Sequence, residues 1–118
     1  MQTILAVDDS ETMRQMVKMT LQAGNYQVLV ASDGEEGLKK FLSTEGVDLI
    51  ITDINMPKMD GIGLIRAIRT HNTTIPILAL TTESEDGMRK KGAEAGANGW
   101  LVKPFKPAQF MDIVRQIL

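Results

Sequence analysis

Five short apolar runs, separated by amphipathic segments, are the feature that most restricts how this chain folds. The runs cover residues 4–7, 28–31, 47–52, 77–80 and 100–102. Nearly all are continuous rather than alternating, so they predict strands buried on both faces, as in a parallel sheet covered by helices. The segments between and after them carry apolar residues at spacings of three and four, which indicates five helices. The pattern predicts one α/β domain with a doubly wound, five-stranded parallel sheet.

Local signals mark where the first helix begins and ends. Ser10 precedes the amphipathic segment 11–21 and predicts an N-cap, since its hydroxyl can accept a hydrogen bond from a free backbone N–H of the first turn. Gly24 follows the segment and predicts its end. Similar start and stop signals separate the later runs, so each helix is expected to join one strand to the next.

Composition excludes several classes of protein. The 118 residues include no cysteine, which leaves neither a disulfide framework nor a thiolate metal site. The net charge of −2 argues against a nucleic-acid or membrane-surface binder, which would carry a basic excess. No apolar run approaches the roughly 20 residues needed to cross a bilayer, and the N-terminus lacks the features of a signal peptide. We therefore expect a cytoplasmic protein.

Polar residues follow the apolar runs at the ends where ligands bind in open α/β sheets. These residues are Asp8 and Asp9 after the first run, Asp53 after the third, Thr81 after the fourth and Lys103 after the fifth. Parallel strands present their carboxyl ends at one edge, so we expect these side chains to converge. Three carboxylates so close together repel one another, and a stable arrangement requires a cation.

The cation that suits this set is Mg²⁺. Cysteine is absent and the one histidine, His71, lies in a polar loop stretch, so zinc and copper have no ligand set. Mg²⁺ prefers a few carboxylates and retains waters, and it commonly works on a phosphoryl group. A carboxylate beside it can act as the nucleophile. Asp53 is the best candidate, because it lies between the other acids and the side of the site that carries Thr81 and Lys103.

Four motifs in this order carry a family resemblance. They are Val7-Asp8-Asp9-Ser10, Asp53-Ile54-Asn55-Met56-Pro57, Leu80-Thr81 and Gly99-Trp100-Leu101-Val102-Lys103-Pro104-Phe105. The chain resembles response-regulator receiver domains of two-component systems, and most of all the stand-alone chemotaxis members. The resemblance implies a flavodoxin-like fold with strand order 2-1-3-4-5. It also implies a single receiver domain over 1–118 with no output domain.

The resemblance implies a role for each site residue. Asp53 matches the phosphoacceptor, which receives its phosphoryl group from a histidine kinase or a small phosphodonor. Thr81 and Lys103 match the residues that contact the phosphoryl group. The implied ligands of Mg²⁺, for which Mn²⁺ or Ca²⁺ can substitute, are Asp8, Asp9, Asp53 and the backbone carbonyl of Asn55. Asn55 and Glu83 match positions that tune self-dephosphorylation, so we expect a short-lived phosphoryl group. The bond between Lys103 and Pro104 is expected to be cis.

The fourth helical segment and the last strand predict the switch and the partner surface. Residues 84–95 form a weak helix, because Gly87 and Gly92 each cost up to about 1 kcal/mol relative to alanine. Trp100 occupies the position of the family's switch aromatic, more often Tyr or Phe, and we expect it to move with Thr81. The basic residues expected on the partner surface are Arg89, Lys90, Lys91 and Lys106. The resemblance implies that the protein acts by binding a protein target, such as a flagellar motor switch component. It also implies that the protein is a monomer and not a conventional enzyme.

Three other functions fit parts of the pattern. A flavodoxin-like electron carrier shares the topology, but the acids of Asp8-Asp9-Ser10-Glu11 would repel the phosphate of a flavin. An aspartyl phosphohydrolase would carry an Asp-x-Asp arrangement after the first strand, whereas here the acids are adjacent. A receiver fold kept purely for interaction would be expected to lack Asp53, Thr81 or Lys103, and all three are present.

Overall fold

Each apolar run forms one strand of a single parallel sheet. The structure is a computed structural model that describes residues 1–56, 59–82 and 86–118, the last with only the backbone of 86–89. The strands are β1 (Thr3–Val7), β2 (Gln27–Ala31), β3 (Val47–Asp53), β4 (Ile77–Thr81) and β5 (Gly99–Val102). They pair in the order β2-β1-β3-β4-β5, and every pairing is parallel. The expected flavodoxin-like topology is confirmed.

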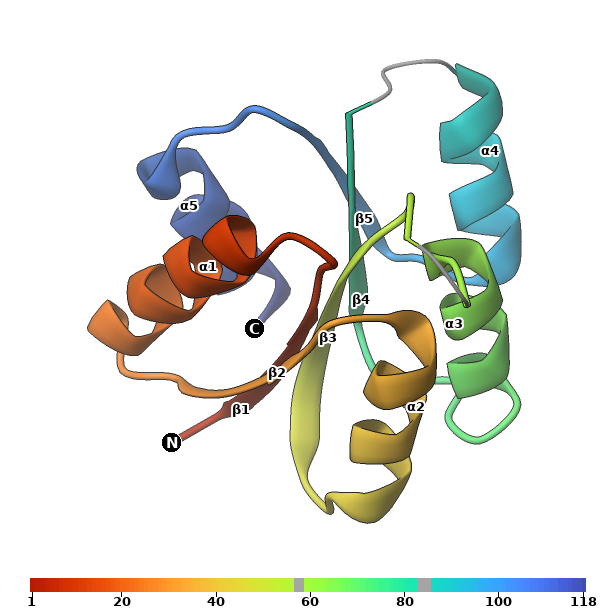
Figure 1. Ribbon diagram of the computed structural model, residues 1–118, viewed down its shortest axis with the longest axis horizontal. Helices are drawn as coiled ribbons and strands as arrows, with labels where there is room; N and C mark the ends of the chain where they lie inside the picture. The colour runs from red at the N-terminus through yellow and green to blue at the C-terminus, as the bar shows by residue number, and fades with distance from the viewer. Residues whose placement is uncertain (57–58, 83–85) are drawn as a thin grey trace.

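Helices cover both faces of this sheet. They are α1 (Glu11–Ala23), α2 (Gly34–Ser43), α3 (Gly61–Arg69), α4 (Asp86–Ala95) and α5 (Pro107–Ile117). Figure 1 shows α1 and α5 on one side of the sheet and α2, α3 and α4 on the other. The helix expected over 84–95 is present from Asp86, and its first two expected residues lie outside the described part of the chain. No helix in the described ranges is long and apolar enough to cross a membrane.

The hydrophobic core has two parts, one on each face of the sheet. Along β1, Ile4 and Ala6 belong to the part that includes Phe110 of α5, while Leu5 and Val7 belong to the other. Successive side chains of a strand point to opposite faces, so a strand covered on both sides must be apolar at every position. This is why the runs are continuous in the sequence.

Side-chain caps place the starts of α1 and α3 beside the ends of the preceding strands. The Ser10 hydroxyl accepts a hydrogen bond from the Met13 N–H at 3.2 Å, as the sequence predicted. Asp60 caps α3 in the same way, accepting from the Gly63 N–H at 2.8 Å. Both helices therefore begin directly after short loops at the carboxyl edge of the sheet, where the polar residues gather.

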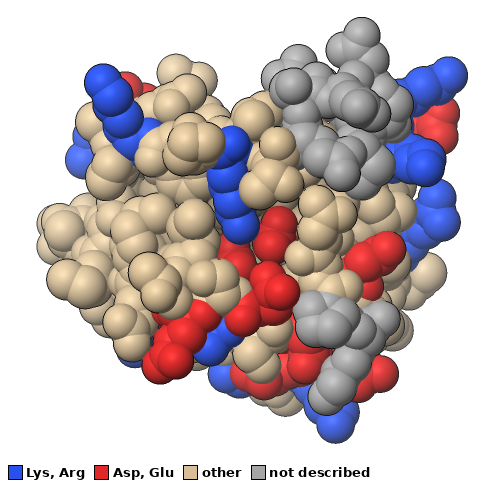
Figure 2. Space-filling view, turned by 45° about the horizontal axis from the view of Figure 1, so that its top comes forward, with Lys and Arg blue, Asp and Glu red and all other residues tan. Residues whose placement is uncertain are grey.

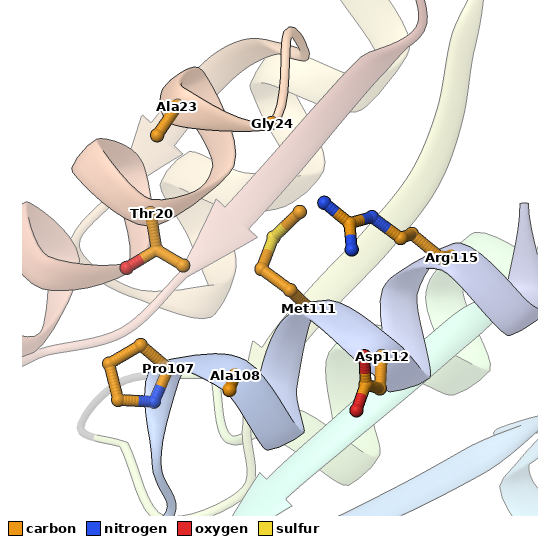
Figure 3. A pocket seen from close by; sticks show the side chains of 8 residues that line it. All are labelled: Thr20, Ala23, Gly24, Pro107, Ala108, Met111, Asp112 and Arg115. Atoms are coloured by element: carbon orange, nitrogen blue, oxygen red, sulfur yellow. The ribbon is translucent and has the colours of Figure 1, made fainter.

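A surface groove lies between α1 and α5. It has a volume of about 440 Å³ and is lined by Thr20, Ala23, Gly24, Pro107, Ala108, Met111, Asp112 and Arg115. Figure 3 shows the Met111 side chain extending from α5 toward α1 within it. None of the polar residues expected at the carboxyl edge lines this groove, so it is separate from the candidate site.

Candidate functional site

Strand register explains why the expected polar residues converge. Val7 pairs with Thr52, which places the next residues of the two strands, Asp8 and Asp53, side by side. Asp53 pairs in turn with Leu80, which immediately precedes Thr81. Because Thr81 pairs with Val102, Lys103 follows at the same edge.

The three aspartates form one compact acidic cluster. Carboxylate oxygens of Asp8, Asp9 and Asp53 all lie within 4.8 Å of one another. Asp8 is 4% exposed and Asp53 6% exposed, whereas Asp9 lies at the surface. Figure 2 shows acidic side chains gathered in the middle of this face of the molecule, with a basic side chain beside them. The cluster is thus half-enclosed, with one member open to solvent.

Lys103 bridges two of these acids. Its Nζ donates a hydrogen bond to Oδ2 of Asp8 at 2.9 Å and lies 3.5 Å from Oδ2 of Asp53. Its backbone N–H donates to the Thr81 carbonyl at 2.7 Å, which joins the end of β5 to the end of β4. The bond from Lys103 to Pro104 is cis. The ammonium therefore sits closer to Asp8 than to the candidate nucleophile.

Asp8 is held by more contacts than its neighbours in the cluster. The Ser10 N–H donates to its Oδ1 at 2.9 Å. Nη1 of Arg14 donates to its carbonyl oxygen at 2.7 Å. Arg14 had no assigned role in the sequence reasoning, although a signal existed. A basic residue near the start of a helix is slightly unfavourable for the helix dipole, which is a weak signal of a specific contact.

Asp53 is fixed through its backbone and that of the loop after it. The Ile54 N–H donates to the Leu80 carbonyl at 2.9 Å, and the Gly61 N–H donates to the Ile54 carbonyl at 2.9 Å. A Cβ on Gly61 would lie 2.2 Å from the Asp53 carbonyl oxygen. Only glycine permits this approach, which brings the start of α3 directly against the end of β3.

Burial raises the pKa of Asp53 to about 6, since desolvation disfavours the charged carboxylate. The Lys103 ammonium lowers this pKa, and the nearby charges of Asp8 and Asp9 raise it. Three carboxylates facing one ammonium leave a net negative charge in a partly buried site. A hard, oxygen-preferring cation relieves that repulsion, so the donor set fits Mg²⁺.

The other predicted residues lie around this centre. Thr81 is fully buried at the end of β4, and Trp100 is half-buried on β5. Asn55 is exposed and lines a pocket of about 430 Å³ that also includes Asp60 of the β3–α3 loop. The predicted partner-surface lysines are all exposed: Lys90, Lys91 and Lys106. Glu83 and the side chain of Arg89 lie outside the described residues.

Comparison with known proteins defines the class. Residues 4–115 match the model of the response regulator receiver domain. The chain therefore belongs to this family and is the receiver domain of a two-component response regulator. The cluster of Asp8, Asp9 and Asp53 is consistent with Mg²⁺ binding at the usual receiver-domain site.

Individual relatives differ in length. The chemotaxis protein CheY4 of Vibrio cholerae is 43% identical, with a TM-score of 0.96 over 100% of this chain and 99% of its own. The chemotaxis protein CheY1 of Helicobacter pylori is 37% identical over 98% of this chain and 95% of its own. The transcriptional regulatory protein PhoP of Bacillus subtilis is 41% identical over 98% of this chain, which spans only 48% of that relative.

One similar solved structure is a complex with a ligand. The response regulator TrrA of Thermotoga maritima, described in complex with Mg²⁺ and BeF, is 34% identical with a TM-score of 0.91 over the whole of both chains. The chain studied is thus similar both to chemotaxis proteins of its own size and to the receiver portions of longer regulators.

Proposed function

We propose that this receiver domain is switched by phosphorylation of Asp53. The observation that carries the proposal is the acidic cluster, in which Asp53 is buried beside Asp8 and within 3.5 Å of the Lys103 ammonium. An Oδ atom of Asp53 attacks the phosphorus of a phosphohistidine on a histidine kinase, and the bond from phosphorus to the histidine nitrogen breaks. The product is an acyl phosphate on Asp53.

The chain's own groups stabilise the charge that this transfer brings. Lys103 would contact the phosphoryl oxygens from the β5 side, and the Thr81 hydroxyl would contact them from β4. Asp8, Asp9, Asp53 and the backbone carbonyl of Asn55 would hold Mg²⁺, with Mn²⁺ or Ca²⁺ as substitutes. When bound, the ion neutralises charge on the transferred group. The site then returns to its resting state by hydrolysis of the acyl phosphate, with Asn55 and Glu83 setting the lifetime.

Output would pass through the surface formed by α4, β5 and α5. Lys90 and Lys91 are exposed on α4, and Lys106 is exposed immediately before α5, which favours a protein target with an acidic face. The similarity to CheY4 and CheY1 over nearly their entire lengths supports a chemotaxis target, such as a flagellar motor switch component. We propose that the domain is a cytoplasmic monomer that acts by binding rather than as a conventional enzyme.

Phosphorylation by a small donor tests the core of this proposal. The protein is incubated with acetyl phosphate and Mg²⁺, and its intact mass is measured over time. We expect a gain of one phosphoryl group that disappears within minutes to hours after the donor is removed. Chelation of Mg²⁺ should suppress the gain.

Two variants make the result specific. Asp53→Ala should take up no phosphoryl group, whereas Asp112→Asn, which changes an exposed carboxylate on α5, should behave as the unmodified protein does. Uptake by Asp53→Ala at the unmodified rate would contradict the proposal. A pull-down with each protein, with and without donor, then identifies the target.

A further inference from the structure

The indole of Trp100 lies against α4 at Gly92, a position without a side chain. A Cβ on Gly92 would lie 2.5 Å from Cζ3 of the indole and 3.1 Å from its Cε3. Ordinary van der Waals contact begins at 3.4 Å. Gly92 itself is buried. The outer edge of the indole therefore fills the volume that an alanine methyl would need, and the two residues fit as a pair.

The part of α4 that receives the indole is tied to α3. The Arg69 guanidinium donates to the Gly96 carbonyl from Nε at 3.1 Å and from Nη2 at 2.8 Å. Nη2 also donates to Oδ1 of Asn98 at 2.8 Å, and the same oxygen accepts the Ile77 N–H at 2.9 Å. The C-terminal turn of α4 is thus anchored, and Trp100 packs one turn before the anchor.

Two features bear on whether the indole can leave this position: its buried Nε1 and a neighbouring surface pocket. Its Nε1 is buried and has no hydrogen-bond partner among the described residues. Trp100 also lines a surface pocket of about 310 Å³ with Ala93, Ala97, Asn98 and Gly99, which gives the ring space to move into.

We propose that Gly92 is the positioning residue for Trp100. Its missing side chain lets the indole lodge against the anchored end of α4, and the pair acts as a latch between β5 and α4. A movement of α4 that closes the space over Gly92 expels the ring. The link between this latch and signalling rests on the proposed function, but the latch itself exists in the unphosphorylated protein and is testable there.

A double-mutant cycle tests the pairing without phosphorylation. The proteins are the unmodified chain, Gly92→Ala, Trp100→Phe and the double variant, each unfolded in urea. In the Phe background the smaller ring leaves room for a methyl group, so Gly92→Ala should raise the folding equilibrium constant about fivefold, as expected for glycine to alanine inside a helix. In the Trp background we expect that gain to be lost or reversed.

Emission from Trp100, the chain's sole tryptophan, gives the second measurement. Gly92→Ala should shift it to the red, because the displaced indole becomes more exposed to water. The pairing is supported by a red shift together with at least a threefold difference between the two backgrounds. An equal gain in both backgrounds, or an unchanged emission spectrum, overturns it.

The link to signalling is tested with Mg²⁺ and beryllofluoride, the phosphoryl mimic used with a relative of this chain. We expect the mimic to change Trp100 emission in the unmodified protein and to change it less than half as much in Gly92→Ala, where the ring is already displaced. A full-sized change in Gly92→Ala overturns the link. No change in the unmodified protein overturns the switch under the proposed function, while the pairing is decided separately by the cycle.

Discussion

The neighbouring helices α3 and α4 are attached to the sheet in different ways. α3 buries three large aliphatic side chains, Leu64, Ile65 and Ile68, and begins at the Asp60 cap. Among residues 90–95 of α4, whose side chains are described, the buried residues are Gly92 and Ala95. Burial of a large aliphatic side chain contributes about 1.5–3 kcal/mol, whereas glycine and alanine contribute far less.

This difference assigns the two helices separate tasks. α3 follows Asp53 and packs through Gly61 against the backbone of that residue, so it holds the acidic site in place. The described part of α4 is held by an indole and a guanidinium that reach it from other elements. Elements with few large buried contacts open at low free energy, and such elements carry most switching motions. Under the proposed function, we expect the site to stay fixed while the helix beside it moves.

The largest expected effect on the free energy of unfolding comes from truncating a buried side chain of α3. Ile65→Ala should lower the free energy of unfolding by about 3 kcal/mol, since it removes a fully buried side chain and leaves a cavity. The matched change on α4, Ala95→Gly, should cost only about 1 kcal/mol. Urea unfolding followed by circular dichroism measures both. Equal losses would remove the distinction between the two helices.

Neutralising the candidate nucleophile should stabilise the fold. The pKa of Asp53 is about 6 in the folded chain and 3.8 as the ordinary value, so the folded state holds this proton more tightly. Stability therefore falls as pH rises from about 4 to about 6, and the penalty is complete above that window. In metal-free buffer at pH 7, Asp53→Asn should gain about 3 kcal/mol.

The pH dependence separates this charge effect from a packing effect. Below about pH 3, under both pKa values, the carboxyl is mostly protonated in the folded and the unfolded chain, so Asp53→Asn and the unmodified protein should be nearly equally stable there. Urea midpoints at several pH values, with EDTA present, measure the difference. A gain that persists unchanged at low pH would mean that burial of charge at Asp53 is not its cause.

The anchor of α4 gives the smallest of the three effects on stability and a local one. Arg69→Gln removes the hydrogen bonds to Gly96 and should cost about 1 kcal/mol. Amide exchange at Gly96 and Ala97 should accelerate, while α3 keeps its protection. Arg66→Gln, an exposed position on the same helix, is the control and should leave exchange unchanged. Uniform acceleration across both helices would show that Arg69 supports the whole fold rather than the end of α4.

Sequence patterns predicted most of the fold because the determinants are local or strictly periodic. Continuous apolar runs specify two-sided burial, so the five strands and their parallel pairing were predictable. Ser10 and Gly24 marked the ends of α1 because capping depends on the immediately adjacent backbone. The convergence of Asp8, Asp9 and Asp53 also followed, since parallel strands end at one edge.

Tertiary structure alone decided which of these groups touch. The composition contains several lysines and aspartates, yet only the packing of β5 beside β4 places the Lys103 ammonium nearer to Asp8 than to Asp53. Gly92 read as a weakness of its helix in the sequence, whereas the structure shows the indole of Trp100 lodged against it. Spacing along the chain determines which face a residue occupies, but the distances between faces depend on how whole elements pack. The residues of the acidic site could thus be predicted from the sequence, whereas the packing of Trp100 against α4 was decided by the tertiary structure.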